Sequence, residues 1–206
     1  MRRILMASGI LLVMAAPMAI AGPVAPAEEQ PAAEVRTVVQ KLGEQTVAAF
    51  QANEVDERRK LLAEAAPAFD FMEIGRGVLN HANVKVPTNR EPEILDGVSI
   101  YVKRVMASEL ERIRPEKAEI GNVALKGPAE ARVALILAGP QDQLAGDWQL
   151  KKSEAGWRVT DIFVSGNSLV SHLGGKLSRH AAGGIEQLDE FLKGERERMK
   201  KQTAQR

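Results

Sequence analysis

The sequence has no cysteine and few aromatic residues, and each absence excludes a class of function. Without cysteine, the chain cannot form a disulfide, a thiolate metal site or a cysteine nucleophile. Aromatic residues make up only 4% of the chain, so it lacks the stacking platforms that bind single-stranded nucleic acid. The 28 basic and 27 acidic residues leave a net charge of +1. We therefore expect no nucleic-acid partner, because no overall positive field favours one.

Catalytic and nucleotide-binding motifs are missing as well. The sequence contains no G-x-S-x-G turn, no H-E-x-x-H motif and no P-loop. Its histidines, His81, His172 and His180, lack the spacing of a zinc site. The glycine pairs at 174–175 and 183–184 adjoin expected helices with no strand before them, so we interpret them as helix breaks. We expect neither a metal nor a cofactor.

The N-terminus has the pattern of a secretory signal peptide. Arg2 and Arg3 precede an apolar run over residues 4–20, and Ala19-Ile20-Ala21 forms an A-x-A cleavage motif. We expect residues 1–21 to be cleaved and the mature protein to be exported to the periplasm. An uncleaved membrane anchor is the alternative, because the run has about the length of a marginal span. Residues 22–33 are rich in alanine and proline and are expected to form a flexible linker.

Helical periodicity dominates residues 34–113. Apolar residues such as Val35, Val39 and Leu42 recur at the spacing that places them on one helix face. Further helices are expected on both sides of Pro67. A long one is predicted from about residue 91 to residue 113.

The period changes after Pro115. Short segments there alternate apolar and polar residues or are continuously apolar: 118–125, 131–138, 146–152 and 157–164. Glycine-containing turns separate them, which predicts an antiparallel meander. Helical patterns return near Leu169 and again from Ile185 to about Leu192. Because helices and strands are segregated along the chain, the expected fold is α+β.

The last residues, 194–206, are predicted to be a basic tail. The tail could contact an anionic membrane or an acidic partner. Alternatively it is the solvated, frayed end of a helix. The domain itself is expected to occupy residues 34–193.

Asp161 lies inside an apolar strand, between Val159 and Phe163. On a sheet face it could be a general base. It could equally be an outward polar residue or a capping partner for the next helix. The sequence does not place a histidine near Asp161, and these three interpretations stay open.

Two stretches resemble the MlaC/toluene-tolerance family of exported lipid-binding proteins. In residues 156–192 the resemblance rests on Trp157, Asp161, the G-x-S-L turn at 166–169 and the G-G-I segment at 183–185. The second stretch is Phe69-Asp70-Phe71 with the residues that follow it. Together with the signal peptide and the order of elements, the resemblance covers roughly residues 34–193.

The resemblance implies a non-enzymatic carrier with an NTF2-like sheet, packed helices and a lipid cavity between them. Such proteins hold a phospholipid and move it between an outer-membrane lipoprotein complex and an inner-membrane ABC transporter, which involves transient membrane proximity. One subgroup is associated with hopanoid biosynthesis, so a hopanoid is an alternative ligand. Two other hypotheses remain: an NTF2-like enzyme that uses Asp161, and an accessory protein whose interior is filled by its own side chains.

Aliphatic and aromatic side chains suit acyl chains, although periodicity alone cannot separate a filled core from a lipid pocket. The residues predicted to line the lipid cavity are Phe69, Met72, Tyr101, Val105, Val133, Leu135, Leu137, Trp148, Leu150, Phe163, Leu169 and Leu173.

Overall fold

The computed structural model describes the backbone of residues 26–204 and the side chains of residues 29–201. The expected signal peptide lies outside the described residues. The elements follow one another as α1 (Pro26–Gln51), α2 (Val55–Ala65), the 3-10 turn η1 (Ala66–Ala68), α3 (Phe71–His81), α4 (Glu91–Ile113), β1 (Lys117–Leu125), β2 (Glu130–Ala138), β3 (Gln143–Ser153), β4 (Gly156–Val164), β5 (Asn167–Ser168), α5 (Leu169–Ala181) and α6 (Ile185–Ala204).

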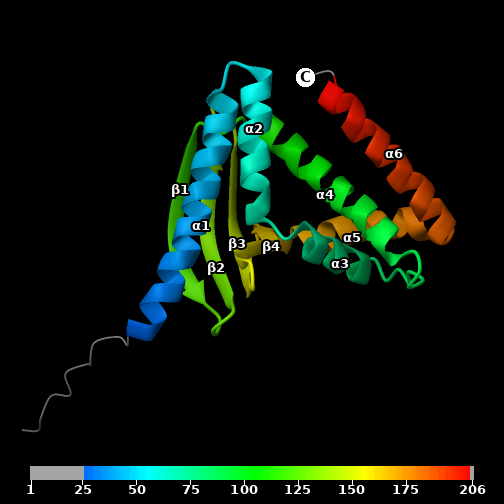
Figure 1. The fold of residues 1–206 in the computed structure, drawn as a ribbon, viewed down its shortest axis with the longest axis horizontal. Coiled ribbons are helices and arrows are strands. Elements are labelled where there is room, and N and C mark those ends of the chain that lie inside the picture. Colours follow the sequence, from blue (N-terminus) through cyan, green and yellow to red (C-terminus); the bar gives the residue numbers. More distant parts are fainter. Residues whose placement is uncertain (1–25, 205–206) are drawn as a thin grey trace, which may run out of the picture.

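The strands form one antiparallel sheet in the order β1-β2-β3-β4-β5. The predicted meander and the α+β fold class are therefore confirmed. The short strand β5 pairs with β4 at the edge of the sheet, and α5 follows it directly. Figure 1 shows α1 and α2 along one side of the sheet and α3 to α6 grouped beside it.

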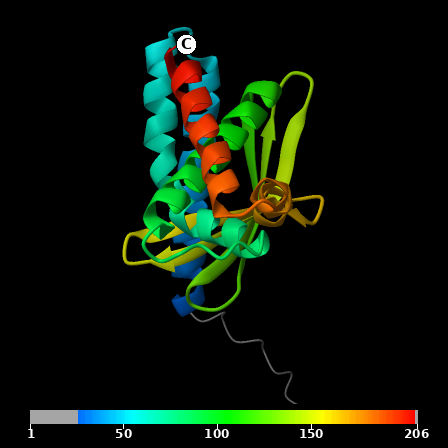
Figure 2. The same ribbon diagram turned by 90° about the vertical axis from the view of Figure 1, so that its right-hand side faces the viewer.

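Two separate hydrophobic cores hold these parts together. The first lies between α1 and the inner face of the sheet, where Val35 and Val39 pack with Leu135 and Leu150. A side chain at Gly43 would lie 2.8 Å from the Ala118 methyl carbon, so glycine allows α1 to approach the sheet. The second core lies among α3, α4, α5 and α6, and Figure 2 shows α6 crossing α4 within this group.

The expected linker at residues 22–33 is wrong from Pro26 onward, because α1 begins there. Alanine, glutamate and glutamine in this stretch are strong helix formers, and proline is well tolerated in the first turn. The later turns of α1 are fixed by packing on the sheet, and a helix that is already nucleated extends cheaply into such a sequence. A linker was expected because this stretch is rich in alanine and proline. Pro31 nevertheless lies inside α1.

The tail expected from residue 194 is not separate from the domain, because α6 continues to Ala204. Of the two interpretations, the helix end agrees with the structure, and most of its side chains are exposed or half-buried. Glu195 is fully buried and pairs with Arg104 of α4 and Arg198 of α6. One turn-and-a-half earlier, Asp189 accepts a hydrogen bond from Arg90 at 2.6 Å. Glu195 and Asp189 of α6 therefore bind Arg104 on α4 and Arg90 just before it, a role that net charge along the sequence does not reveal.

Burial alone would raise the pKa of the Asp189 carboxyl group. Hydrogen bonds from Lys193 and Arg90 outweigh that effect and hold the pKa below its ordinary value. Asp189 is therefore charged near neutral pH, as its two cationic partners require.

Replacing Arg104 with alanine is expected to lower the free energy of unfolding by about 3 kcal/mol, because it leaves the buried Glu195 carboxylate short of its main partner. Arg198→Ala should cost less than about 1 kcal/mol, because that guanidinium is largely exposed. Urea denaturation of both variants measures the difference. Equal effects would contradict the assignment of Arg104 as the main partner.

Candidate functional site

A cavity of about 770 Å³ lies at the seam between the two cores. Phe69, Met106 and Leu169 line it, and each of them packs against both cores. Ligand pockets in proteins usually measure about 300–1,000 Å³. The cavity is therefore large enough to hold a sizeable molecule rather than a few waters.

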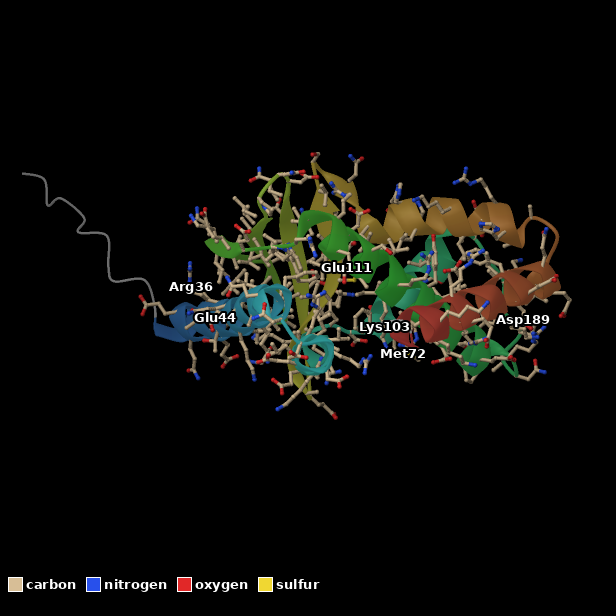
Figure 3. All side chains as sticks on the ribbon, turned by 90° about the horizontal axis from the view of Figure 1, so that it is seen from above. Arg36, Glu44, Met72, Lys103, Glu111 and Asp189 are labelled. Atoms are coloured by element: carbon tan, nitrogen blue, oxygen red, sulfur yellow. The ribbon has the colours of Figure 1, made fainter. Side chains whose placement is uncertain are left out.

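Four parts of the fold supply apolar walls. The sheet contributes Leu137, Leu144, Trp148 and Ile162, α1 and α2 contribute Leu42, Phe50 and Leu62, α4 contributes Val105, Met106 and Leu110, and α5 contributes Leu169. The C-terminal half of α4 spans the space between the α1–α2 pair and the other helices, as the labelled Lys103 and Glu111 show in Figure 3. Such a lining favours hydrocarbon over polar ligands.

A row of aromatic rings leads from the rim of the cavity to the sheet. The Lys103 ammonium group lies 4.8 Å from the centroid of the Phe71 ring. Phe71 stacks on Phe69 with centroids 5.2 Å apart, and Phe69 lies 5.9 Å from Trp148. The row forms one continuous apolar surface on the cavity wall.

Hydrogen bonds of Asp70 hold the segment Phe69-Asp70-Phe71 so that its two rings face the cavity. The Asp70 backbone N–H donates to the Val159 carbonyl at 2.9 Å, which fastens the segment to β4. The Asp70 carboxylate accepts a hydrogen bond from the Glu73 backbone at 2.9 Å and caps α3. The middle residue of the motif is thus structural, and the two phenylalanines line the cavity.

Most charges on the cavity rim are paired. Arg112 binds Glu109 at 3.0 Å and also contacts Asp142. Glu111 of α4 lies 4.0 Å from the Arg58 guanidinium of α2. The rim carboxylates are thus already matched by cations of the same chain.

Asp161 is a capping residue for the start of α5. Its carboxylate accepts hydrogen bonds from the Ser168 hydroxyl at 2.6 Å and from the Val170 backbone at 3.1 Å. It also accepts from the Ile162 backbone at 2.8 Å. Of the open interpretations, capping of the next helix is confirmed, and both carboxylate oxygens are engaged in it.

Asp161→Ala is expected to lower the free energy of unfolding by about 2 kcal/mol, because hydrogen bonds to a charged acceptor are lost at the start of α5. Asp147→Ala is the matched control, since that carboxylate is exposed on β3. Urea denaturation compares the two variants. A loss no larger than that of the control would contradict the capping role.

Only part of the predicted lining lies on the cavity. Phe69, Val105, Leu137, Trp148 and Leu169 are on its wall. Val133, Leu135 and Leu150 are buried in the core between α1 and the sheet, and Tyr101 and Leu173 are buried in the helical core. Met72 is 42% exposed at the surface. Periodicity identified inward faces here, but it could not indicate where the interior is filled and where it is hollow.

Phe163 is placed on the opposite face of the sheet by a β-bulge. Leu150 pairs with Val159 whereas the adjacent Gln149 pairs with Asp161, so Thr160 is an extra residue in β4. After the bulge, the residues of β4 that face the cavity are shifted by one position. Ile162 rather than Phe163 therefore faces the cavity. The Phe163 ring lies instead beneath the Arg132 guanidinium, 4.0 Å away.

Several lining residues were not predicted, among them Leu62, Phe71, Met106, Leu110 and Ile162. One signal for them was present in the sequence. Val105, Met106 and Leu110 point to more than one side of α4, which is typical of a helix segment with apolar surroundings beyond a single seam.

The fold and the cavity define an α+β protein built around an apolar binding chamber. Residues 35–188 match the family described as MlaC protein, and the chain belongs to this family. The predicted resemblance is therefore confirmed. No curated protein sequence matches the chain.

A solved structure with the same fold is that of a phospholipid-binding protein from Ralstonia solanacearum, in complex with a phospholipid. It superimposes with a TM-score of 0.63 at 19% sequence identity, over 82% of this chain and 98% of that one. At this identity the likeness establishes the shared fold.

Proposed function

We propose that this protein is a lipid carrier that holds the acyl chains of a phospholipid in the cavity between its two cores. The observation that carries the proposal is the apolar chamber of about 770 Å³, lined from the sheet, α2, α4 and α5. Membership of the MlaC family and the shared fold with a phospholipid-binding protein support it.

The cost of placing hydrocarbon in water explains why a lipid carrier must cover the acyl chains. Exposing acyl chains to water costs about 0.8 kcal/mol per methylene, so two chains of about fifteen methylenes would cost roughly 24 kcal/mol. That exceeds the practical affinity ceiling of about 21 kcal/mol. A carrier need not match this value, but it must cover most of both tails and still release them.

The proposal extends to transport between membranes. The protein is exported to the periplasm and exchanges lipid with an outer-membrane lipoprotein complex and an inner-membrane ABC transporter. None of the described helices is both long and apolar enough to cross a membrane. Hand-off works best when the donor, carrier and acceptor sites are close in free energy.

The competing hypotheses fit the structure less well. An accessory protein filled by its own side chains would have no chamber of this size. An enzyme based on Asp161 would need a carboxylate free to move a proton, whereas this one is bound to the start of α5. A non-catalytic role is therefore part of the proposal.

Native mass spectrometry of the mature protein, purified from a host with membranes, tests the proposal together with lipid extraction. We expect one phospholipid per protein. A stoichiometric hopanoid would instead assign the protein to hopanoid transport. Lipid-free protein that also takes up no lipid from vesicles would refute the carrier function.

A further inference from the structure

The part of α5 that lines the cavity grades from apolar to cationic. Its cavity-lining residues are Leu169, His172 and Lys176, which are three and four residues apart and therefore form one stripe along the helix. At 1.5 Å per residue, the stripe spans about 10 Å. Leu169 packs against both cores, whereas His172 is exposed and Lys176 is half-buried. This order follows that of a phospholipid, from its tails to its headgroup.

The two polar residues of this stripe have no counter-charge in the part of the chain that the structure describes. Among the residues whose side chains the structure describes, neither His172 nor Lys176 forms a hydrogen bond or an ion pair. The rim carboxylates Glu109 and Glu111 are paired with Arg112 and Arg58. A ligand at the α5 stripe therefore meets uncompensated positive charge.

The stripe is held in place from its opposite side. Leu173 and Leu177 are fully buried in the helical core. A side chain at Gly174 would lie 2.7 Å from the His81 Cβ, so α5 packs closely on α3. Asp161 and the N-cap Ser168 fix the first turn. Lys176 is thus directed to the cavity by packing around α5.

We propose that His172 and Lys176 bind the phosphate of the lipid headgroup and select phospholipids with a net negative charge. This inference rests on the proposed function. The compact ammonium group of lysine pairs well with phosphate. A zwitterionic headgroup carries an additional cation that would face the same uncompensated charge. The carboxylates among the described lining residues, Glu109 and Glu111, are already paired and so do not receive that cation.

The test is a competition at equilibrium. The delipidated mature protein is mixed with equal amounts of phosphatidylglycerol and phosphatidylcholine with identical acyl chains, in neutral detergent micelles. Native mass spectrometry gives the ratio of the bound lipids. We expect wild-type protein to favour phosphatidylglycerol by about threefold to tenfold, and Lys176→Glu to reverse or abolish the preference. Lys41→Glu on the exposed surface of α1, away from the cavity, is the matched control and should keep the wild-type ratio.

A wild-type ratio near one would overturn the inference while leaving the carrier function intact. An equal loss of preference in the Lys41 variant would also overturn it, since the effect would then arise from net charge. Lys176→Gln provides a second variant with a smaller perturbation and should give an intermediate ratio. Failure of wild-type protein to bind either lipid would refute the proposed function itself.

Discussion

Leu110→Glu is expected to remove at least nine-tenths of the lipid that co-purifies with the protein. Leu110 is half-buried on α4 and lines the cavity one helical turn after Met106. A carboxylate there would lie among acyl chains without a partner, at a cost of several kcal/mol. Each 1.4 kcal/mol of binding free energy is a tenfold change in affinity. In the lipid-free protein the same carboxylate can be hydrated from the cavity, so the fold should survive.

The matched control is Val55→Glu. Val55 is 41% exposed on α2 and lies off the cavity. Lipid content is measured by extraction and mass spectrometry, and circular dichroism checks that both variants are folded. Unchanged lipid content in a folded Leu110→Glu variant would contradict the assignment of the cavity as the lipid site.

The sequence predicted the elements well because local chemistry specifies them. Alternating residues and glycine-containing turns defined the strands, and the pairing of Val133 with Trp148 places them on one face, as their alternation predicts. The Phe69-Asp70-Phe71 motif entered the prediction through the family resemblance, and of its two rings only Phe69 was predicted to line the cavity. The capping role of Asp70 was not predicted and follows from its contact with the Glu73 backbone.

The lining could be predicted only in part, because it depends on long-range geometry. Leu135 and Leu137 share a face of β2, yet only Leu137 reaches the cavity. At Leu135 the space is filled by α1, since a Cβ at Gly43 would lie 3.8 Å from the Leu135 Cδ1 atom. The bulge that turns Phe163 away depends on one unpaired residue in β4. The role of Glu195 depends on a partner on α4, which lies far away in sequence.

The second large effect is expected on the rate of lipid release, and it concerns the wall of the cavity that α2 forms. Helix α2 packs chiefly on α1 and η1, while Arg58 of α2 reaches Glu111 of α4 across the rim at 4.0 Å. Arg58 also donates hydrogen bonds to the carbonyls of Ala49 and Ala52 at the end of α1. An ion pair thus joins the α1–α2 pair to α4 across the rim of the cavity. We expect lipid to leave when this wall moves away from α4.

Linking the two helices should therefore trap bound lipid. The chain has no cysteine, so an Arg58→Cys, Glu111→Cys double variant offers a unique pair of thiols. A short bismaleimide suits the span, because the native side chains that meet here are long. After the double variant is crosslinked, transfer of a fluorescent phospholipid to acceptor vesicles should slow at least about tenfold. A tenfold slower rate corresponds to about 1.4 kcal/mol added to the barrier for release. The same variant without the crosslinker is the control and should release lipid at least as fast as wild type. An unchanged rate after crosslinking would show that lipid leaves past α5 instead.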